Sequence, residues 1–458
     1  MSASLVNTRQ IFLRLQIWLL LSVIATHVAE CERKLRQAHI LFRHGNRSPV
    51  AVYETDNITE DMWPQGLGQL TDKGMEQHYI LGKWLHHRYV VENKLLSERY
   101  KRSEIYIRST AYDRTIMSAQ SCLAGLYEVD ASMPIYGLRW HPIPVWTVKK
   151  DTDYVFLNPN GTPCPRLKEL AKQRAESDEV VNYINQNKTF FDLVQKRTGL
   201  SPESVFLNYT RVGDAVIMER LDGRKSNTWA QDEKIYKKLV QIVDYGHEIA
   251  FKNPTAEETR LRSGLLIKEI YHSFQDIVTD SKHHNAHIFS AHDTTLAPFL
   301  AGIGQFDNKR PTTASCVLLE LYEETEKNGD KRYSVEMYFR RWQNKTDDDP
   351  PKMWIKNCSS FACPLEEFNN LVKNLMPEDI EKECNYKPNS PSTALGKFII
   401  FTLLLSCVIL VLAIITCLFR GSKGRIRLWT KKKRFEPINF QLLGNPGSDS
   451  EDGEVFDP

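Results

Sequence analysis

Short runs of β-branched and apolar residues recur in the first and last thirds of the chain, with polar segments between them. Each run has the length and composition of a β-strand. The runs cover residues 38–42, 104–107, 287–290, 315–319 and 334–338. Apolar residues at helical spacing lie between the runs. One such stripe, able to face a sheet, consists of Met75, Tyr79, Gly82, Leu85 and Tyr89.

The middle of the chain has a different pattern. Residues 150–260 are polar and rich in Lys, Glu, Gln and Asn, with helical spacing in pieces such as Trp229–Ala250. An alternation of strands and helices that is interrupted by a helical insertion is typical of an α/β sheet domain with a separate helical layer. We therefore expect an α/β fold with an inserted, mostly α-helical cap at about 150–260.

Both ends of the chain carry membrane-related patterns. Residues 1–30 combine Arg9 and Arg14 with a short apolar run and small residues, which predicts a signal peptide; an N-terminal anchor or a buried helix is the alternative. Residues 398–419 are uncharged and long enough to form a transmembrane helix. Basic residues follow this run, so the tail at 420–458 is expected in the cytosol. The pattern predicts a single-pass type I membrane protein with residues 31–391 outside the cytosol.

Composition narrows the class of the folded part. The 458 residues are 41% hydrophobic and 26% charged, which excludes disorder, collagen and coiled coil as the main architecture. A net charge of +3 gives no argument for nucleic acid as a partner. Of nine cysteines, six lie in the segment 31–391 beyond Cys31 and are expected to oxidise in the secretory pathway. Spacing alone leaves their pairing open. Five favourable glycosylation sequons lie in the same segment, at Asn57, Asn187, Asn208, Asn344 and Asn357.

Three of the expected strands end in clusters of Arg, His and Asp. The first runs into Arg43-His-Gly-Asn-Arg-Ser-Pro49, the second into Arg108-Ser-Thr-Ala-Tyr-Asp-Arg114, and the third into Ser290-Ala-His-Asp-Thr-Thr295. Ligands of open α/β sheets bind beyond the carboxyl ends of the strands, so these clusters are expected to meet. No cluster has the ligand spacing of a metal site, and the pairs His86–His87 and His283–His284 are interpreted as solvated.

Their chemistry suits a phosphate monoester. Guanidinium groups bind several phosphate oxygens at once, histidine can be the covalent nucleophile, and a protonated carboxyl can donate to the leaving oxygen. Arg43, Arg47 and Arg114 supply the cations, and His44 supplies the nucleophile. His292 is a further donor and Asp293 an acid. Arg108 is interpreted as a supporting cation.

These motifs identify the chain as similar to the histidine acid phosphatases, in the lysosomal and prostatic branch. The similarity spans nearly all of residues 31–391. It includes Arg-His-Gly-x-Arg-x-Pro, Ser-Ala-His-Asp-Thr-Thr, Trp63-Pro-Gln-Gly-Leu-Gly-Gln-Leu-Thr71, Trp140-His-Pro-Ile-Pro-Val145 and Cys363-Pro-Leu-Glu366. The resemblance implies a Rossmann-like mixed sheet flanked by helices, with a helical cap and often a homodimer. It also implies catalysis without a metal or cofactor.

Carried over by position, the resemblance assigns catalysis to His44 and Asp293. It assigns phosphate binding to Arg43, Arg47, Arg114 and His292. It further implies the disulfides Cys164–Cys384 and Cys358–Cys363. Cys316 matches half of a third disulfide whose other half is missing near 212–219, which leaves Cys122 as a candidate partner. The chain departs from the family at Asn46 and Ala111, where Asp is usual, and we expect altered rate or pH profile from these changes.

The resulting hypothesis is a membrane-anchored glycoprotein, lysosomal or at the cell surface and endosomes, that hydrolyses phosphate monoesters through a phosphohistidine on His44. Acidic conditions are expected because Asp293 must begin protonated. Three narrower substrate classes remain on the same scaffold: lysophospholipids, nucleotides and inositol phosphates. A catalytically silent surface receptor is the alternative of a different class, although the nucleophile and the acid are both present.

Overall fold

The computed structural model describes residues 32–129, 140–156, 164–200, 205–342 and 349–386, together with residues 406 and 410. The expected signal peptide and cytosolic tail lie outside these residues, as does the expected span at 398–419 apart from residues 406 and 410. In this described part, no helix is both long and apolar enough to cross a membrane.

A mixed sheet lies at the centre of the fold, in the order β3-β2-β4-β1-β5-β6-β7, with β8 paired to β6. The strands are β1 (Glu32–Arg43), β2 (Ile105–Ser109), β3 (Trp146–Thr147), β4 (Ala286–Ala291), β5 (Cys316–Thr325), β6 (Lys331–Arg340), β7 (Lys352–Met353) and β8 (Cys363–Pro364). The first four run parallel, whereas β5 and β6 are antiparallel to their neighbours. All five predicted strands are confirmed, each inside or within one residue of an observed strand.

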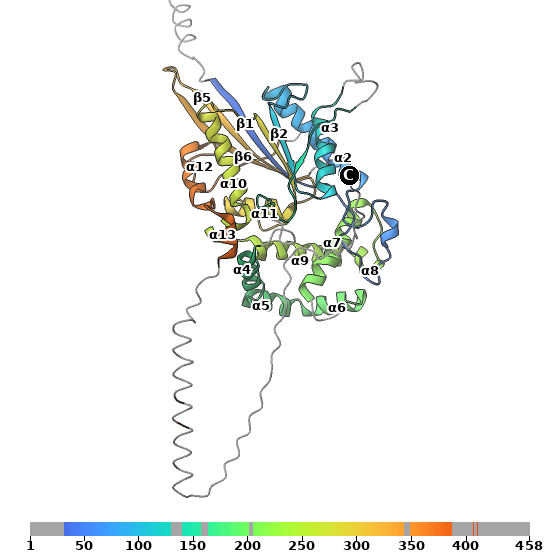
Figure 1. Ribbon diagram of the computed structural model, residues 1–458. Coiled ribbons are helices and arrows are strands. Elements are labelled where there is room, and N and C mark those ends of the chain that lie inside the picture. Colours follow the sequence, from blue (N-terminus) through green and yellow to red (C-terminus); the bar gives the residue numbers. More distant parts are fainter. Residues whose placement is uncertain are drawn as a thin grey trace, which may run out of the picture.

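Helices cover both faces of the sheet (Figure 1). The layer on one face consists of α2 (Asp72–His86), η2 (His87–Glu92) and α3 (Asp113–Leu126), and that on the other of α10 (Ala256–Val278), α11 (Asp293–Gly302) and α12 (Leu365–Val372). Alternate residues of β1 point to opposite faces. Ile40 and Phe42 therefore pack under α2 and α3, whereas Leu41 packs under α10 and α11. The double cover explains why these strands have apolar residues on both faces.

The stripe predicted on the first helix is partly wrong. Gly82, Leu85 and Tyr89 are buried, but Met75 and Tyr79 are only partly covered. The face that meets the sheet is rotated toward His78 and Leu81, both fully buried.

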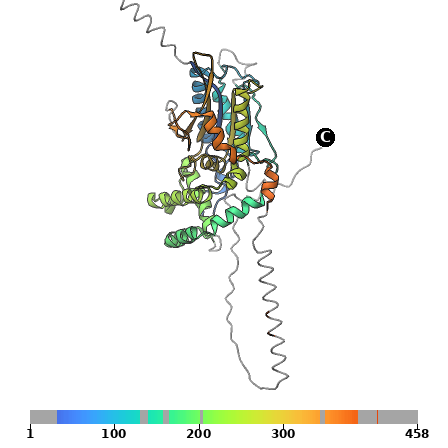
Figure 2. The ribbon, with the colours of Figure 1, turned by 90° about the vertical axis from the view of Figure 1, so that its left-hand side faces the viewer.

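The helical insertion forms a layer at the carboxyl ends of β1 and β2 (Figures 1 and 2). Its helices are α4 (Pro165–Ala175), α5 (Asp178–Gln186), α6 (Lys188–Thr198), α7 (Val205–Asp222), α8 (Thr228–Gln231) and α9 (Glu233–Phe251). A separate core, which includes Phe191, Val216 and Leu239, holds α5–α9 together, whereas α4 packs against α10 and α13 (Ile380–Asn385). The next helix, α10, begins at a capping box formed by Thr255 and Glu258 and packs on the sheet. We refer to α4–α9 as the cap.

Two of the cysteine pairings are confirmed and the third is wrong. Cys164 is bonded to Cys384, and Cys358 to Cys363. Cys122 and Cys316 are buried free thiols within the same apolar cluster as α2 and α3. Burial raises the pKa of Cys316 to about 12 and that of Cys122 well above its usual value. Because the thiolate is the reactive form, these side chains behave as small apolar groups.

A buried pair of carboxyl groups joins the cap to the loop that follows β1. Glu219 on α7 is fully buried, its side chain accepts from the hydroxyl of Ser226, and the carboxyl group of Asp56 lies next to it. Burial, together with the nearby Asp56 charge, raises the pKa of Glu219 to about 8. Burial also raises the pKa of Asp56. The Arg224 charge lowers the pKa of Glu219 only in part, so the two facing carboxyl groups favour a shared proton.

The protein is therefore expected to unfold at a higher temperature at pH 5 than at pH 8. A carboxyl whose pKa is raised in the folded state stabilises the fold fully below its unfolded value, and this stabilisation is lost as pH rises through about 8. Glu219→Gln should reduce the difference between the unfolding temperatures at pH 5 and pH 8 by several degrees, as measured by thermal unfolding. Glu233→Gln, at an exposed position of the cap, is the control. An unchanged pH dependence in Glu219→Gln would contradict this assignment.

Candidate active site

The segment after β1 is held tightly against neighbouring strands and the start of α2. The amide of Arg43 donates to the carbonyl of Ser315, and the amide of His44 donates to that of Ala291, both at 3.0 Å. Gly45 then passes so close to Gly74 that a Cβ at position 45 would lie 2.3 Å from the Gly74 carbonyl oxygen. Glycine is required here for space, and the contact fixes the direction in which His44 leaves the strand.

His44 is buried and held in one tautomer. Its Nδ1 lies 2.8 Å from the carbonyl oxygen of Gly45, which can only accept, so Nδ1 carries the hydrogen and Nε2 keeps its lone pair. Burial lowers the pKa of His44 well below its usual value, and the charges of Arg43 and Arg114 lower it further. The ring therefore stays neutral at acidic pH, which is the form that a nucleophile needs.

Three guanidinium groups surround His44. Arg43 donates to the Pro311 carbonyl at 2.7 Å and forms an ion pair with Asp293 at 2.9 Å. Arg47 donates both terminal nitrogens to Asp214 on α7, each at 2.9 Å. The Nε atoms of Arg43, Arg47 and Arg114 are buried without a hydrogen-bond partner among the described residues.

Burial lowers the pKa of Arg43 to about 9 and that of Arg114 to about 10. Crowded and poorly solvated cations of this kind are stabilised by an anion that accepts from several of them at once. The three arginines therefore form a site suited to a phosphate.

The end of β4 supplies the other two predicted residues. His292 is the N-cap of α11, and its Nε2 lies 3.0 Å from the hydroxyl of Thr110 at the end of β2. The rings of His44 and His292 have centroids 5.5 Å apart. Burial lowers the pKa of His292 well below its usual value. All six residues predicted from the sequence are therefore brought to one edge of the sheet, beneath the cap.

The structure changes the expectation for Asp293. Its Oδ1 accepts from the Thr294 amide at 2.8 Å, and its Oδ2 faces Arg43. Burial alone would raise the pKa of Asp293, but Arg43, His247 and Arg310 together outweigh burial and hold that pKa well below its usual value. The structure thus favours an ionised Asp293 in the free protein, whereas the sequence analysis expected a protonated one.

Three charged or titratable residues near the site were missed from the sequence. Asp214 and His247 come from cap helices α7 and α9, and Arg310 comes from the segment before β5. The Nη1 of Arg310 lies 3.4 Å from Asp214, and the Nε2 of His247 lies 3.7 Å from Asp293. Nothing in the sequence pattern places a cap helix against these strand ends.

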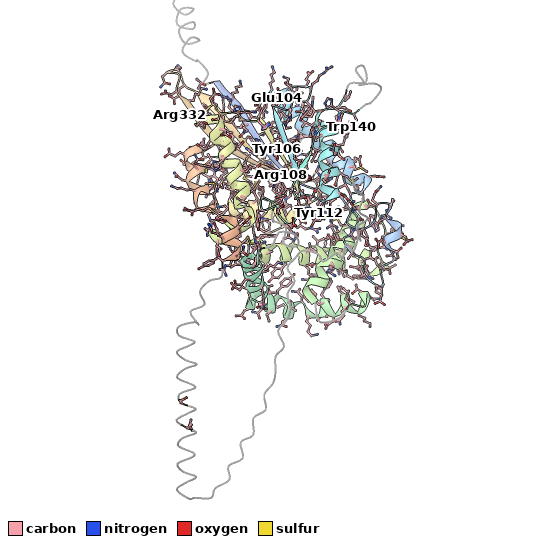
Figure 3. The ribbon with its side chains drawn as sticks, in the orientation of Figure 1. Glu104, Tyr106, Arg108, Tyr112, Trp140 and Arg332 are labelled. Atoms are coloured by element: carbon pink, nitrogen blue, oxygen red, sulfur yellow. A yellow bond between two sulfur atoms is a disulfide. The ribbon has the colours of Figure 1, made fainter. Side chains whose placement is uncertain are left out.

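Arg108 lies apart from the phosphate site. It points to Asp153 at 2.6 Å and packs over the ring of Phe156. Figure 3 shows Glu104, Tyr106, Arg108 and Tyr112 following one another toward the cap, along β2 and the residues on either side of it. Of these four residues, Tyr112 is nearest the cap. Its ring packs edge-on against that of His292, with centroids 5.1 Å apart, and the guanidinium carbon of Arg114 lies 4.5 Å from the centroid of the Tyr112 ring. Tyr112 thus forms a wall of the site, whereas Arg108 supports the strand end.

Asn46 has a structural partner of its own. Its side-chain amide donates to the carboxylate of Asp222 and to the hydroxyl of Thr71, both at 3.2 Å. An aspartate at position 46 would place two carboxylates together and they would repel each other. The neutral amide of Asn46 instead donates a hydrogen bond to the Asp222 carboxylate. Asn46 thus stands beside the phosphate site without entering it. Nothing in the structure explains Ala111.

Comparison with known proteins gives consistent matches. A family model described as the histidine phosphatase superfamily (branch 2) matches residues 34–340. The chain is 37% identical to "Lysosomal acid phosphatase" of Bos taurus, over 77% of this chain and 80% of that protein. It is 36% identical to "Prostatic acid phosphatase" of Homo sapiens, over 80% of this chain and 90% of that protein.

Solved structures show the same fold at lower identity. The phytase from Citrobacter braakii superposes with a TM-score of 0.57 at 16% identity, over 77% of this chain and 99% of that one. The Hafnia alvei phytase in complex with tartrate superposes with a TM-score of 0.57 at 17% identity, over 78% of this chain and 99% of that one. At these identities, the likeness concerns the mixed α/β fold and carries no statement about substrate.

Proposed function

The chain belongs to branch 2 of the histidine phosphatase superfamily, and from its site we propose an acid phosphatase that hydrolyses phosphate monoesters through a phosphohistidine on His44. The similarity to lysosomal and prostatic acid phosphatases supports this activity. The observation that carries the mechanism is a neutral His44 with its Nε2 lone pair free, set among three buried arginines.

In the first step, His44 Nε2 attacks phosphorus and the ester oxygen leaves. Arg43, Arg47 and Arg114 bind the phosphoryl oxygens and stabilise their charge, with His292 at the same site. Asp293 gives a proton to the leaving oxygen. In the second step, water attacks the phosphohistidine and Asp293 receives the proton, which returns His44 to its free state.

The preference for acid follows from the bound phosphate. The second ionisation of a phosphate monoester falls near pH 6, so acidic solution provides a monoanion that carries a proton. A dianion in the site would also draw Arg43 toward itself and weaken the ion pair that lowers the Asp293 pKa. Both effects let Asp293 hold a proton only once the substrate is bound.

The remaining expectations are part of the same proposal. They are a lumenal or extracellular domain, a single membrane span at 398–419, lysosomal or cell-surface placement, and a homodimer as one candidate assembly. The relatives named lysosomal and prostatic acid phosphatases support a lysosomal or secreted destination. Catalysis is proposed to need no metal or cofactor, because the arginines and histidines supply all of the charge stabilisation.

The test is release of p-nitrophenol from p-nitrophenyl phosphate by the full chain, purified from eukaryotic cells in detergent. The assay covers about pH 3 to about pH 9 and includes EDTA. We expect an acidic optimum that survives the chelator. Activity lost in EDTA would contradict the metal-free mechanism, and a folded protein without activity would favour a silent receptor.

A further inference from the structure

One titratable residue next to Asp293 has no role in the mechanism above. His247 lies on cap helix α9 and is 9% exposed. Its Nδ1 is 3.1 Å from the carbonyl oxygen of Val243, one helical turn earlier. Its Nε2 points to Asp293, 3.7 Å from Oδ2, and has no hydrogen-bond partner among the described residues. An unpartnered buried nitrogen that faces the proposed acid requires an explanation.

The hydrogen bonds determine which atoms can hold a proton. A carbonyl oxygen only accepts, so Nδ1 of His247 carries a hydrogen permanently and Nε2 is the nitrogen that titrates. On Asp293, Oδ1 is occupied by the Thr294 amide, which leaves Oδ2 as the oxygen that can be protonated. The two titrating atoms of this pair therefore face each other. The distance of 3.7 Å is beyond a direct hydrogen bond, and such contacts often tighten only when substrate binds.

We propose that His247 is a positioning residue that holds the proton which Asp293 delivers to the leaving group. This rests on the proposed phosphatase function and on the role of Asp293 in it. Before the substrate binds, Nε2 of His247 is the place for this proton, because it faces Oδ2 of Asp293. When the phosphate dianion engages Arg43, the N–H bond of His247 breaks and an O–H bond forms at Asp293 Oδ2.

The proton balance closes over one turnover. In the first step the Asp293 O–H bond breaks as the phosphorus–oxygen ester bond breaks, and the leaving group departs as a neutral alcohol. In the second step the attacking water gives its proton to Asp293 Oδ2, and the proton returns to His247 Nε2. His44 and Asp293 finish as they began, and inorganic phosphate is released.

The surrounding charges make this pair responsive to the substrate. Arg43 comes from β1, Arg310 from the segment before β5, and both act on Asp293. Asp214 from α7 lies among the same cations, and Arg47, Arg114 and His292 line the phosphate site. These cations oppose a proton on Asp293 in the free site, whereas a bound phosphate cancels part of their charge. The pair therefore gains proton affinity at the moment when the leaving group needs it.

The test compares His247→Gln with the wild-type full chain. The readout is kcat against pH for β-glycerophosphate, whose alkoxide needs a proton, and for p-nitrophenyl phosphate, whose phenolate does not. Glutamine keeps a polar side chain but does not titrate. We expect the alkaline limb of kcat for β-glycerophosphate to move to lower pH by about one unit, with the p-nitrophenyl phosphate limb unchanged. Tyr245→Phe, on the same helix and hydrogen-bonded to the Glu179 carbonyl, is the matched control.

The outcomes separate this inference from the proposed function. An inactive wild-type protein would remove the phosphatase itself. An active wild type whose alkaline limb is the same in His247→Gln would overturn only the role of His247, because the proton would then come from the substrate monoanion. A uniform fall in kcat at every pH and with both substrates would assign His247 a merely structural role. Should His247→Gln fail to fold, His247→Asn is measured in the same way.

Discussion

Replacement of His44 by alanine is expected to lower turnover of every phosphate monoester by at least about four orders of magnitude, since the covalent step loses its nucleophile. The His44 side chain is buried among three arginines, and the contact of its Nδ1 with the Gly45 carbonyl leaves Nε2 free to attack. The measurement is kcat for p-nitrophenyl phosphate at acidic pH. Binding of inorganic phosphate should persist, because Arg43, Arg47 and Arg114 remain.

Two further measurements make this prediction specific. Rapid quenching of the wild type with labelled substrate should trap a phosphoenzyme that is stable in alkali and labile in acid, as phosphoramidates are, and His44→Ala should trap none. His283→Ala, at a partly exposed histidine in the segment before β4, should behave as the wild type. Retention of more than about 1% of activity in folded His44→Ala would contradict the assignment of the nucleophile.

Replacement of Asp293 by asparagine is expected to lower kcat for β-glycerophosphate by about 10²- to 10⁴-fold, with a much smaller loss for p-nitrophenyl phosphate. Asparagine keeps the size of the side chain but cannot donate an acidic proton to a departing alkoxide. The comparison of the two substrates in one variant removes errors in protein concentration or folding. Equal losses on both substrates would contradict the role of Asp293 as proton donor.

The same variant should bind inorganic phosphate more tightly. In the free protein, the Asp293 carboxylate occupies Arg43 at 2.9 Å and repels an incoming anion. A neutral amide in place of the carboxylate would remove both effects, so the inhibition constant of phosphate should fall by several-fold. Asp192→Asn, at an exposed cap position paired with Lys188, is the control and should change neither quantity. A weaker affinity for phosphate in Asp293→Asn would show that the ion pair positions Arg43 instead of competing for it.

The six site residues could be predicted because their neighbourhood is a property of the sheet. Parallel strands end at the same edge, so short polar clusters after three apolar runs must meet wherever the runs pair. His44 and His292 follow β1 and β4, which are direct neighbours in the sheet. The strand pattern itself was clear because both faces of the sheet are covered, which requires apolar residues at nearly every position. The family motifs further implied the disulfides Cys164–Cys384 and Cys358–Cys363, which the fold contains.

The residues that the cap contributes to the site could not be predicted from the sequence. A helical pattern shows which face of α7 or α9 is buried, but not which strand end it will meet. Asp214 and His247 were therefore missed, although they face Arg47 and Asp293. The free thiols of Cys122 and Cys316 were equally undetermined, because a cysteine count does not say which sulfur atoms the fold brings into bonding geometry.

By itself, then, the amino-acid sequence determined the strands, the set of side chains at their ends and the kind of anion that this set can bind. These features depend on local pattern and on the rule that neighbouring parallel strands end at the same edge of a sheet. Only the tertiary structure decided the charge state of that set. Burial favours a neutral His44, and the approach of Arg43, His247 and Arg310 favours an ionised Asp293. Such ionisation depends on distances between side chains that are far apart in the chain, and these distances exist only in the folded protein.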